Sequence, residues 1–270
     1  MRVGVLGASG RMGRASCRAV LGSGDVELVA AVARSSAGTR LRELVPEAPD
    51  SLEVHATPAD LLEAKAEAVI DFSAPEATME AARLLLPAGV HIVSGTTGLS
   101  PEAMDELGEL AADRGNGNAV WAPNFALGAV LAQRFATIAA RYYPDAEVIE
   151  MHHAGKADAP SGTALRTARS IASARDASRP GSVRPGRELV TGARGGEVDG
   201  VRVHSVRLPG LVAHQEVIFG GEGQTLTIRH DSIARESFMP GVLLAVRAAV
   251  PDGLSSFWSW WSSMISHSGM

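Results

Sequence analysis

Near its start the sequence reads Gly7-Ala8-Ser9-Gly10-Arg11-Met12-Gly13, and this stretch decides the fold. An apolar run typical of a strand, Val3–Leu6, precedes it, and a helical pattern, Met12–Leu21, follows. Between a strand and a helix, glycines let the backbone approach a pyrophosphate, and the helix N-terminus directs free N–H groups at the anion. The spacing is G-x-x-G-x-x-G, and a tight turn without a ligand is the alternative. The position of the motif favours a dinucleotide-binding loop.

Strands and helices then alternate, which is the pattern of a parallel sheet covered by helices. The clearest helix start has Ser73 as the N-cap, Pro75 in the first turn and Glu76 as the capping-box glutamate. This helix is expected to extend to Leu86, and Ser100 to cap the next, from Pro101. The predicted strands are Val26–Ala33, Ala68–Phe72, Val90–Ser94 and Ala119–Ala122.

The second half of the chain has a different texture. Residues 175–200 form a loop rich in Gly, Pro and Arg, which is too long for a passive connector in a compact domain. A hairpin is predicted across Gly220–Gly223, and a closing helix at Phe238–Ala249 would return to the first domain. The other predicted elements are helices at Leu127–Arg141 and from Thr163 to about Ala174, and strands at Glu147–Met151, Arg202–Arg207, Gln215–Phe219 and Thr225–Arg229.

Composition disfavours several classes of function. The formal net charge of -5 gives no reason to expect a polyanionic partner such as nucleic acid. The only cysteine, Cys17, cannot form an internal disulfide and reads as a small buried residue, which fits the cytoplasm. The N-terminus lacks the pattern of a secretory signal, and the longest uncharged stretches contain Asn, Pro or many serines. We therefore expect a cytoplasmic protein without a membrane span.

The end of the second predicted strand bears on the choice of cofactor. An acid at this point would bind the free ribose hydroxyl of NADH, but the sequence reads Ala33-Arg34-Ser35-Ser36. A cation with neighbouring hydroxyls suits a 2′-phosphate. We therefore predict NADPH as the preferred cofactor and NADH as a second one, with the alternative that Arg34 is a solvated loop residue.

Two loops after later strands are candidates for the nicotinamide end of a cofactor. They are Gly95-Thr96-Thr97-Gly98 and Ala122-Pro123-Asn124-Phe125. Both follow strands at the sheet edge where open α/β folds bind ligands. Taken alone, the first loop is only a turn, and the amide of Asn124 could equally serve a neighbouring loop.

The segment richest in chemistry is Glu150–Thr163, which reads EMHHAGKADAPSGT. Gly162 and Thr163 open a helix whose free N–H groups suit a carboxylate, and Lys156 adds a full positive charge. His152 has a reference pKa of about 6.5 and could donate a proton at neutral pH. The pattern predicts an anionic substrate and a proton-transfer step.

The pair His152-His153 has two other interpretations, a metal-ligand pair and an incidental surface pair. Adjacent strand residues point to opposite faces, so the two imidazoles diverge if the strand continues. The sequence offers no further His or Cys cluster to complete a metal shell. We therefore predict no metal site.

Together these motifs are similar to those of a known family. The chain resembles bacterial 4-hydroxy-tetrahydrodipicolinate reductases, also called dihydrodipicolinate reductases, over about residues 1–250. The resemblance rests on Gly7–Gly13, Asp71-Phe72-Ser73, Gly95–Gly98, Pro123-Asn124-Phe125, Glu150–Thr163, His214-Gln215-Glu216-Val217 and Asp231-Ser232.

The resemblance implies an α/β fold with two domains. A Rossmann-like dinucleotide-binding domain would comprise residues 1–124 and 233–270. Residues 125–232 would form an α+β domain with a mixed, largely open sheet for substrate binding and oligomerisation. The implied protein is a cytoplasmic homotetramer. It would use NADPH or NADH to reduce a cyclic dicarboxylate, hydroxytetrahydrodipicolinate, to tetrahydrodipicolinate in lysine and diaminopimelate biosynthesis, with overall loss of water.

Roles for individual residues follow from the resemblance by position. His152 would be the proton donor and Lys156 the second catalytic group, while His153, Gly162 and Thr163 would bind a substrate carboxylate. The implied cofactor contacts are Gly7, Ala8, Ser9, Gly10, Arg11, Met12, Arg34, Gly95, Thr96, Thr97, Ala122, Pro123, Asn124 and Phe125.

Two features depart from the family pattern. Ala33 stands where some members carry an acid that binds the adenosine ribose, which weakens the expectation of efficient NADH use. The tail after about Leu254, with Trp258, Trp260 and Trp261, does not match a short family ending. The alternatives to the reductase are a non-catalytic NADP(H) sensor or scaffold and a related amino-acid oxidoreductase, because fold alone does not give function.

Overall fold

The computed structural model describes residues 1–113, 115–175 and 186–250. The tryptophan-containing tail and part of the predicted loop at 175–200 lie outside the described residues. The chain divides into two compact units. Unit 1 contains Met1–Phe125 together with helix α7 (Met239–Ala249), and unit 2 is Ala126–Ser237. Each is described separately below.

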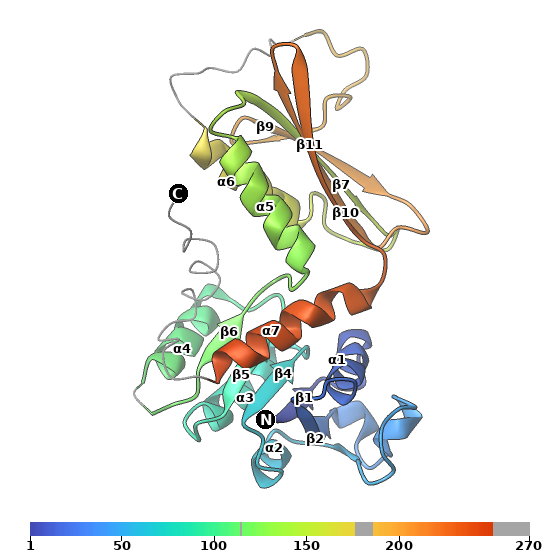
Figure 1. Ribbon diagram of the computed structural model, residues 1–270, viewed down its shortest axis with the longest axis vertical. Coiled ribbons are helices and arrows are strands. Elements are labelled where there is room, and N and C mark those ends of the chain that lie inside the picture. The colour runs from blue at the N-terminus through green and yellow to red at the C-terminus, as the bar shows by residue number, and fades with distance from the viewer. Residues whose placement is uncertain (114, 176–185, 251–270) are drawn as a thin grey trace. The chain divides into compact units, whose positions relative to one another are not determined.

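Unit 1 contains a six-stranded parallel sheet with strand order β3-β2-β1-β4-β5-β6 (Figure 1). The order reverses between β1 and β4, which neighbour each other although they are not consecutive in sequence. At such a reversal, open α/β sheets bind ligands at the carboxyl ends of their strands. The strands are β1 (Arg2–Leu6), β2 (Glu27–Val32), β3 (Val54–His55), β4 (Ala68–Asp71), β5 (His91–Ser94) and β6 (Ala119–Trp121).

Helices cover both faces of this sheet, so its strands are apolar on both sides, as parallel strands usually are. On one face, α1 (Arg11–Leu21) and α7 share a core with alternate residues of β1, such as Val3 and Val5. The opposite core contains α2 (Ala59–Glu63), α3 (Pro75–Leu85) and α4 (Pro101–Ala112). Cys17 is fully buried on α1, as its setting predicted, and burial raises the pKa of its thiol to about 12.

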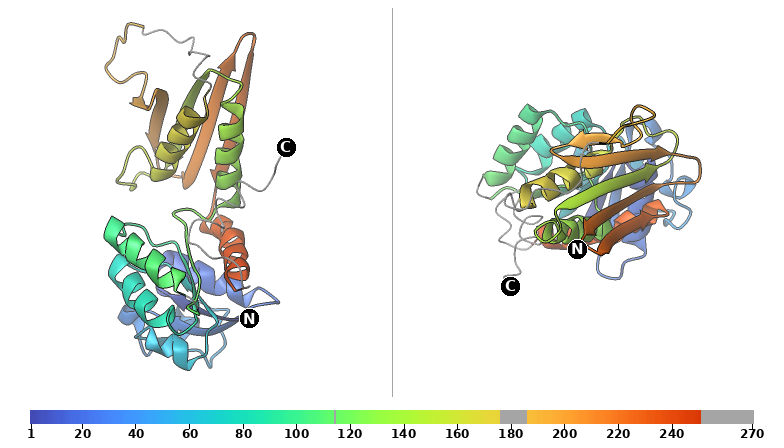
Figure 2. Two further views of the ribbon diagram at one scale, coloured as in Figure 1. Left: turned by 90° about the vertical axis from the view of Figure 1, so that its left-hand side faces the viewer. Right: turned by 90° about the horizontal axis from the view of Figure 1, so that it is seen from above.

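Unit 2 contains a five-stranded mixed sheet with the order β11-β10-β7-β9-β8. The central strand β7 is parallel to β9 and antiparallel to β10, and β10 and β11 form the predicted hairpin. Helices α5 (Leu127–Ala139) and α6 (Gly162–Ala174) pack on one face (Figures 1 and 2). The strands are β7 (Asp145–His152), β8 (Gly196–Val198), β9 (Val201–Arg207), β10 (Ala213–Gly221) and β11 (Gln224–Ser232).

The predicted α/β fold class, with a parallel sheet and a second mixed sheet, is confirmed, but one local prediction is wrong. Ser73 does not cap α3: the N-cap is Ala74, which makes no side-chain capping bond. The Ser73 hydroxyl instead donates to the carboxylate of Asp71 at 2.5 Å, since Ser73 stands one residue before the capping position. The sequence patterns also missed β3, α2 and β8. Within the described residues, no helix combines the length and apolar character needed to cross a membrane.

Candidate active site

The loop between β1 and α1 is shaped to receive an anion. Gly7 has a φ of +80°, and a Cβ on Gly13 would lie 2.1 Å from the carbonyl oxygen of Gly7, so both positions require glycine. Gly10 is the N-cap of α1 and offers no capping side chain, and the first turn contains no acid. The first N–H groups of the helix are therefore available to a ligand. This cradle fits the pyrophosphate of a dinucleotide.

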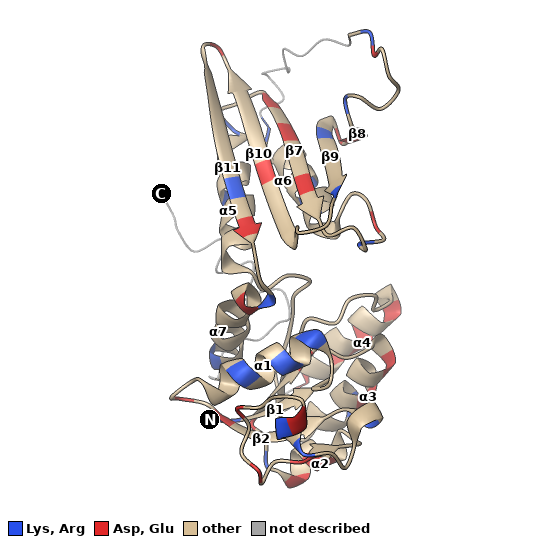
Figure 3. Ribbon diagram, turned by 90° about the vertical axis from the view of Figure 1, so that its right-hand side faces the viewer, with Lys and Arg blue, Asp and Glu red and all other residues tan. Residues whose placement is uncertain are grey.

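Positive charge lies next to this loop. Helix α1 carries Arg11 and Arg14 near its start and has no acidic residue (Figure 3). The guanidinium of Arg14 donates to the carbonyl of Ser9 at 2.9 Å, which holds the glycine loop against the helix. The hydroxyl of Ser9 lies 3.3 Å from that of Ser35, so the glycine loop and the segment after β2 are joined. These cations favour a ligand with several phosphates.

Arg34 begins a short 3-10 turn directly after β2. Its side chain is 68% exposed and forms an ion pair with Glu80 of α3. The predicted 2′-phosphate ligand is thus accessible, but it already has a carboxylate partner. An exposed ion pair is weak, so a phosphate group could displace Glu80.

The two predicted nicotinamide loops combine buried and exposed side chains: Thr97 and Pro123 are exposed and Asn124 is half-buried. Thr96 is buried, and its hydroxyl donates to Asp71 at 3.1 Å, while its carbonyl accepts from the indole of Trp121 at 2.7 Å. Ala122 and Phe125 belong to the core, and the Phe125 ring packs edge-on against Phe72. Any cofactor contact from Thr96, Ala122 or Phe125 would therefore use their backbone atoms.

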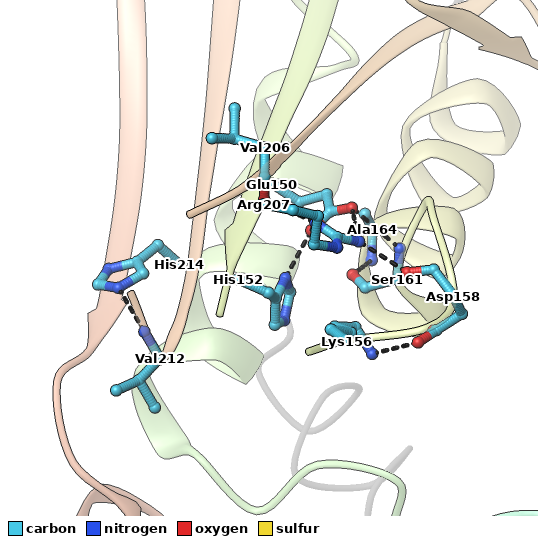
Figure 4. A network of polar contacts seen from close by, with 10 residues as sticks. All are labelled: Glu150, His152, Lys156, Asp158, Ser161, Ala164, Val206, Arg207, Val212 and His214. Atoms are coloured by element: carbon cyan, nitrogen blue, oxygen red, sulfur yellow. Dashed lines mark hydrogen bonds and ion pairs between the residues drawn. The ribbon is translucent and has the colours of Figure 1, made fainter. Parts of the chain in front are cut away.

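In unit 2, the chemical groups gather at the end of β7. Alternate residues of β7 are buried beneath α5 and α6, and Glu150 is on this face with a fully buried side chain. His152, two residues further along, points to the same side by the period of the strand. Its Nδ1 lies 2.5 Å from Oε2 of Glu150, and its side chain is 15% exposed (Figure 4).

Arg207 completes the environment of Glu150. It ends β9 directly opposite His152, and its guanidinium donates to both carboxylate oxygens, at 2.7 and 2.9 Å. The backbone N–H of Ser161 donates to the same carboxylate at 3.2 Å. Burial acts to raise the pKa of Glu150, but hydrogen bonds from Arg207, Ser205 and His152 outweigh it, so this pKa lies below its ordinary value. Glu150 is thus a buried, ionised anchor for the imidazole.

The pKa of His152 lies below its ordinary 6.5. Burial is the largest cause, because it disfavours the imidazolium. The hydrogen bond to Glu150 opposes this effect, and the charges of Lys156 and Arg207 lower the pKa further. In the absence of a ligand, the neutral imidazole is therefore favoured at neutral pH.

The loop after β7 supplies the anion-binding groups. Lys156 is 23% exposed, and its Nζ donates to Asp158 at 2.6 Å, which lowers the pKa of Asp158 (Figure 4). Ser161 caps α6 through a bond from the N–H of Ala164 at 3.2 Å. Gly162, the first residue of α6, is exposed. Among the described residues, no group of three or more His, Cys, Asp or Glu could hold a metal ion.

Comparison with known proteins identifies the family. The family model described as dihydrodipicolinate reductase, N-terminus, matches residues 1–125, and its C-terminal counterpart matches residues 128–257. The chain belongs to the dihydrodipicolinate reductase family. It is 50% identical to the 4-hydroxy-tetrahydrodipicolinate reductase of Moorella thermoacetica and 51% identical to that of Nocardia farcinica, in each case over 92% of both chains.

A solved structure is also closely similar. The dipicolinate-bound dihydrodipicolinate reductase of Paenisporosarcina sp. TG-14 is 41% identical and has a TM-score of 0.81, over 93% of this chain and 94% of that one. GenD2 from gentamicin A biosynthesis, solved in complex with NAD, shares the fold at 18% identity and a TM-score of 0.61, over 94% of this chain and 87% of that one. Membership of the reductase family supports oxidoreductase activity with a nicotinamide dinucleotide in general.

The predicted site residues of this family member differ in their surroundings. His152 and Lys156 are partly buried and have acidic partners, whereas His153 is exposed. His214 and Asp231, which contributed to the resemblance, are partners across the β10–β11 pair, 2.7 Å apart. The assigned roles of these residues remain predictions.

Two charged residues of this candidate site were not predicted from the sequence. Glu150 opened the chemically rich segment but was given no role, although its position two residues before His152 on a strand was a usable signal. Arg207 had no such signal. It reaches Glu150 only because β9, 57 residues later, pairs in parallel with β7.

Proposed function

We propose that this protein catalyses the NAD(P)H-dependent reduction of 4-hydroxy-tetrahydrodipicolinate to tetrahydrodipicolinate in lysine and diaminopimelate biosynthesis. The observation that carries the proposal is the Glu150–His152 pair at the end of β7, beside Lys156, within a chain that matches both halves of the family. The cofactor, when bound, supplies a hydride. Reduction also consumes one proton and releases one water molecule, so the protein must deliver a proton.

The loop from His153 to Thr163 is suited to bind the substrate carboxylates. Lys156 offers a positive charge, and the N–H groups of Gly162 and Thr163 at the start of α6 have no intrahelical acceptor. The exposed imidazole of His153 adds a donor that is free to reorient. The dipicolinate-bound relative supports a cyclic dicarboxylate as the ligand.

His152 is placed to deliver the proton. Glu150 accepts from Nδ1 and so leaves Nε2 as the atom that faces a ligand. A bound dianion would favour the imidazolium and raise the pKa of His152 towards neutrality. After the proton leaves Nε2, the imidazole keeps its Nδ1–H bond to Glu150 and remains oriented.

The titration of His152 is expected to reflect these charges. In the free enzyme, its NMR titration midpoint should lie below 6.5, because burial and the nearby cations disfavour the imidazolium. The charged form is thus lost at a lower pH than in an unfolded chain. Lys156→Met should move the midpoint upwards, because it removes one of these cations. Arg229→Met removes a cation of β11 that is not a cause of this shift and should leave the midpoint unchanged. A downward shift in Lys156→Met would contradict the proposed electrostatics.

NADPH is the proposed preferred cofactor. The exposed guanidinium of Arg34, next to the Ser9–Ser35 hydroxyl pair, supports binding of a 2′-phosphate, and no acid follows β2 to bind a free ribose hydroxyl. Arg34→Ala is expected to raise the KM for NADPH about tenfold, the typical worth of one charge-assisted bond, and to leave that for NADH unchanged. Arg42→Ala, another exposed ion-paired arginine of unit 1, is the control. An equal increase in the KM values for NADPH and NADH would contradict the assignment of Arg34 to the 2′-phosphate.

Assembly as a cytoplasmic homotetramer through unit 2 is part of the proposal. One face of its sheet is covered by α5 and α6, while the other carries charged residues (Figure 3), for example the ion pair Arg229–Glu216. A polar sheet face of this kind suits a wet subunit contact. Sedimentation equilibrium tests the stoichiometry.

The decisive assay follows the loss of NADPH absorbance with purified protein and freshly generated 4-hydroxy-tetrahydrodipicolinate. Turnover that depends on both compounds supports the proposal. Tight cofactor binding without turnover would instead favour a non-catalytic sensor, and turnover with an amino-acid substrate alone would favour a related oxidoreductase.

A further inference from the structure

Asp71 is a buried acid that the proposed chemistry has not yet used. It ends β4 and is only 1% exposed. Its carboxylate accepts five hydrogen bonds, from the N–H and hydroxyl of Ser73 and from the hydroxyls of Thr78, Ser94 and Thr96, at 2.5 to 3.1 Å. An ionised carboxylate is an acceptor only, and this set of donors matches it.

No cation shares this site. Among the ion pairs of the described residues, none involves Asp71, whereas the other buried acid, Glu150, is neutralised by Arg207. Hydroxyl dipoles can compensate the loss of hydration of a carboxylate, but they do not cancel its charge. Asp71 therefore has no counter-charge in direct contact, whereas a guanidinium partner would have supplied one.

The position of Asp71 suggests which part of a bound cofactor its charge would act on. β4 and β5 lie beyond the reversal of strand order, on the half of the sheet opposite to β2 and its Arg34. A dinucleotide that crosses the reversal with its adenosine phosphate near Arg34 places its nicotinamide half over β4 and β5. The Gly95–Thr97 segment follows β5 there, and Asp71 holds it through Ser94 and Thr96.

We propose that Asp71 is a positioning residue that shapes the nicotinamide site and biases it electrostatically towards the oxidised cofactor. The inference rests on the proposed reductase function. A bound dihydronicotinamide that gave up a hydride with its electron pair would change from neutral to cationic, while the proton for the substrate would come from His152. A fixed carboxylate near the nicotinamide site would stabilise the cationic form without moving during the reaction.

The test compares the binding of the two redox forms of the cofactor in Asp71→Asn. Asparagine keeps the shape and one acceptor, and the surrounding hydroxyls can rotate to accept from its amide, so only the charge is removed. Isothermal titration with NADP+ and NADPH gives the ratio of their Kd values. This ratio, NADP+ over NADPH, is expected to rise about three- to tenfold in the variant, as a partly screened unit charge would produce.

Two controls separate charge from structure. Thr96→Val removes one link to the loop but keeps the carboxylate, so both Kd values should rise together with their ratio unchanged. Asp60→Asn alters another hydroxyl-bound aspartate of unit 1, which accepts from Thr57, and should change neither value. The same nucleotide without its nicotinamide ring should bind Asp71→Asn as tightly as it binds the wild type.

An unchanged ratio in a folded Asp71→Asn protein overturns the inference, even if the reductase assay succeeds. If this variant does not fold, the wild-type ratio decides: NADP+ binding much weaker than NADPH binding would contradict a negative site. Failure of the wild type to bind either form would instead count against the proposed function itself. The binding measurements on Asp71→Asn and the wild-type measurements can therefore contradict the inference and the proposed function separately.

Discussion

A His152→Gln variant is expected to lose about 100- to 10,000-fold in kcat, the usual contribution of a positioned general acid. Glutamine retains a polar side chain of similar reach but cannot deliver a proton. The affinity for NADPH should remain, because the cofactor loop belongs to unit 1 and His152 to unit 2. Steady-state kinetics and cofactor titration of the same preparation measure both effects.

His153→Gln is the matched control for this variant. The neighbouring imidazole is exposed and makes no hydrogen bond to Glu150, so its loss should raise the KM for the dicarboxylate and leave kcat nearly unchanged. A pattern with the two effects exchanged would show that His153 is the proton donor. Nearly full activity in His152→Gln would contradict the proposal that His152 delivers the proton.

Glu150→Ala is expected to cost about 3 kcal/mol of unfolding free energy, because it leaves the largely buried guanidinium of Arg207, 18% exposed, without its counter-charge. The change also removes the acceptors of the Ser161 N–H and of His152 Nδ1. Urea unfolding followed by circular dichroism measures the loss, and kcat should fall as well, because the imidazole loses its orientation.

Glu147→Ala is the matched control on the same strand. Its carboxylate also binds an arginine and a histidine, Arg194 and His204, but it is 35% exposed and water can replace it. Its loss should cost about 1 kcal/mol or less. Similar values for the two variants would mean that Glu150 is no more than a surface ion pair in its energetics.

Much of unit 1 could be predicted because its signals are local. The glycine loop, the apolar strands and the helix starts at Pro75 and Pro101 are each contained within a few residues, and the structure has these elements in the expected order. The error at Ser73 was one of position within a local motif. Helix α3 begins one residue later than the capping pattern predicted, with Ala74 as its N-cap, and the Ser73 hydroxyl bonds to Asp71 two residues earlier.

The candidate site was only partly predictable, because its partners come from different strands. His152 and Lys156 stand in one segment and were visible in it, whereas Arg207 depends on the pairing of β7 with β9. The same holds for Glu80, which reaches Arg34 from a helix 46 residues away. Side chains that neutralise or orient a functional group come from segments that are distant in the sequence. Their contacts depend on how strands pair and helices pack, which a local sequence pattern does not show.

The place of α7 in the chain has a consequence for synthesis of the protein. Its apolar residues, including Met239, Val242 and Val246, complete the core on one face of the unit 1 sheet. The ribosome makes the whole of unit 2 before it reaches them. The first domain to begin emerging is therefore the last to be completed. Until residue 249 has left the exit tunnel, α1 alone covers that face of the sheet, and the part over β5 and β6 lacks its helix.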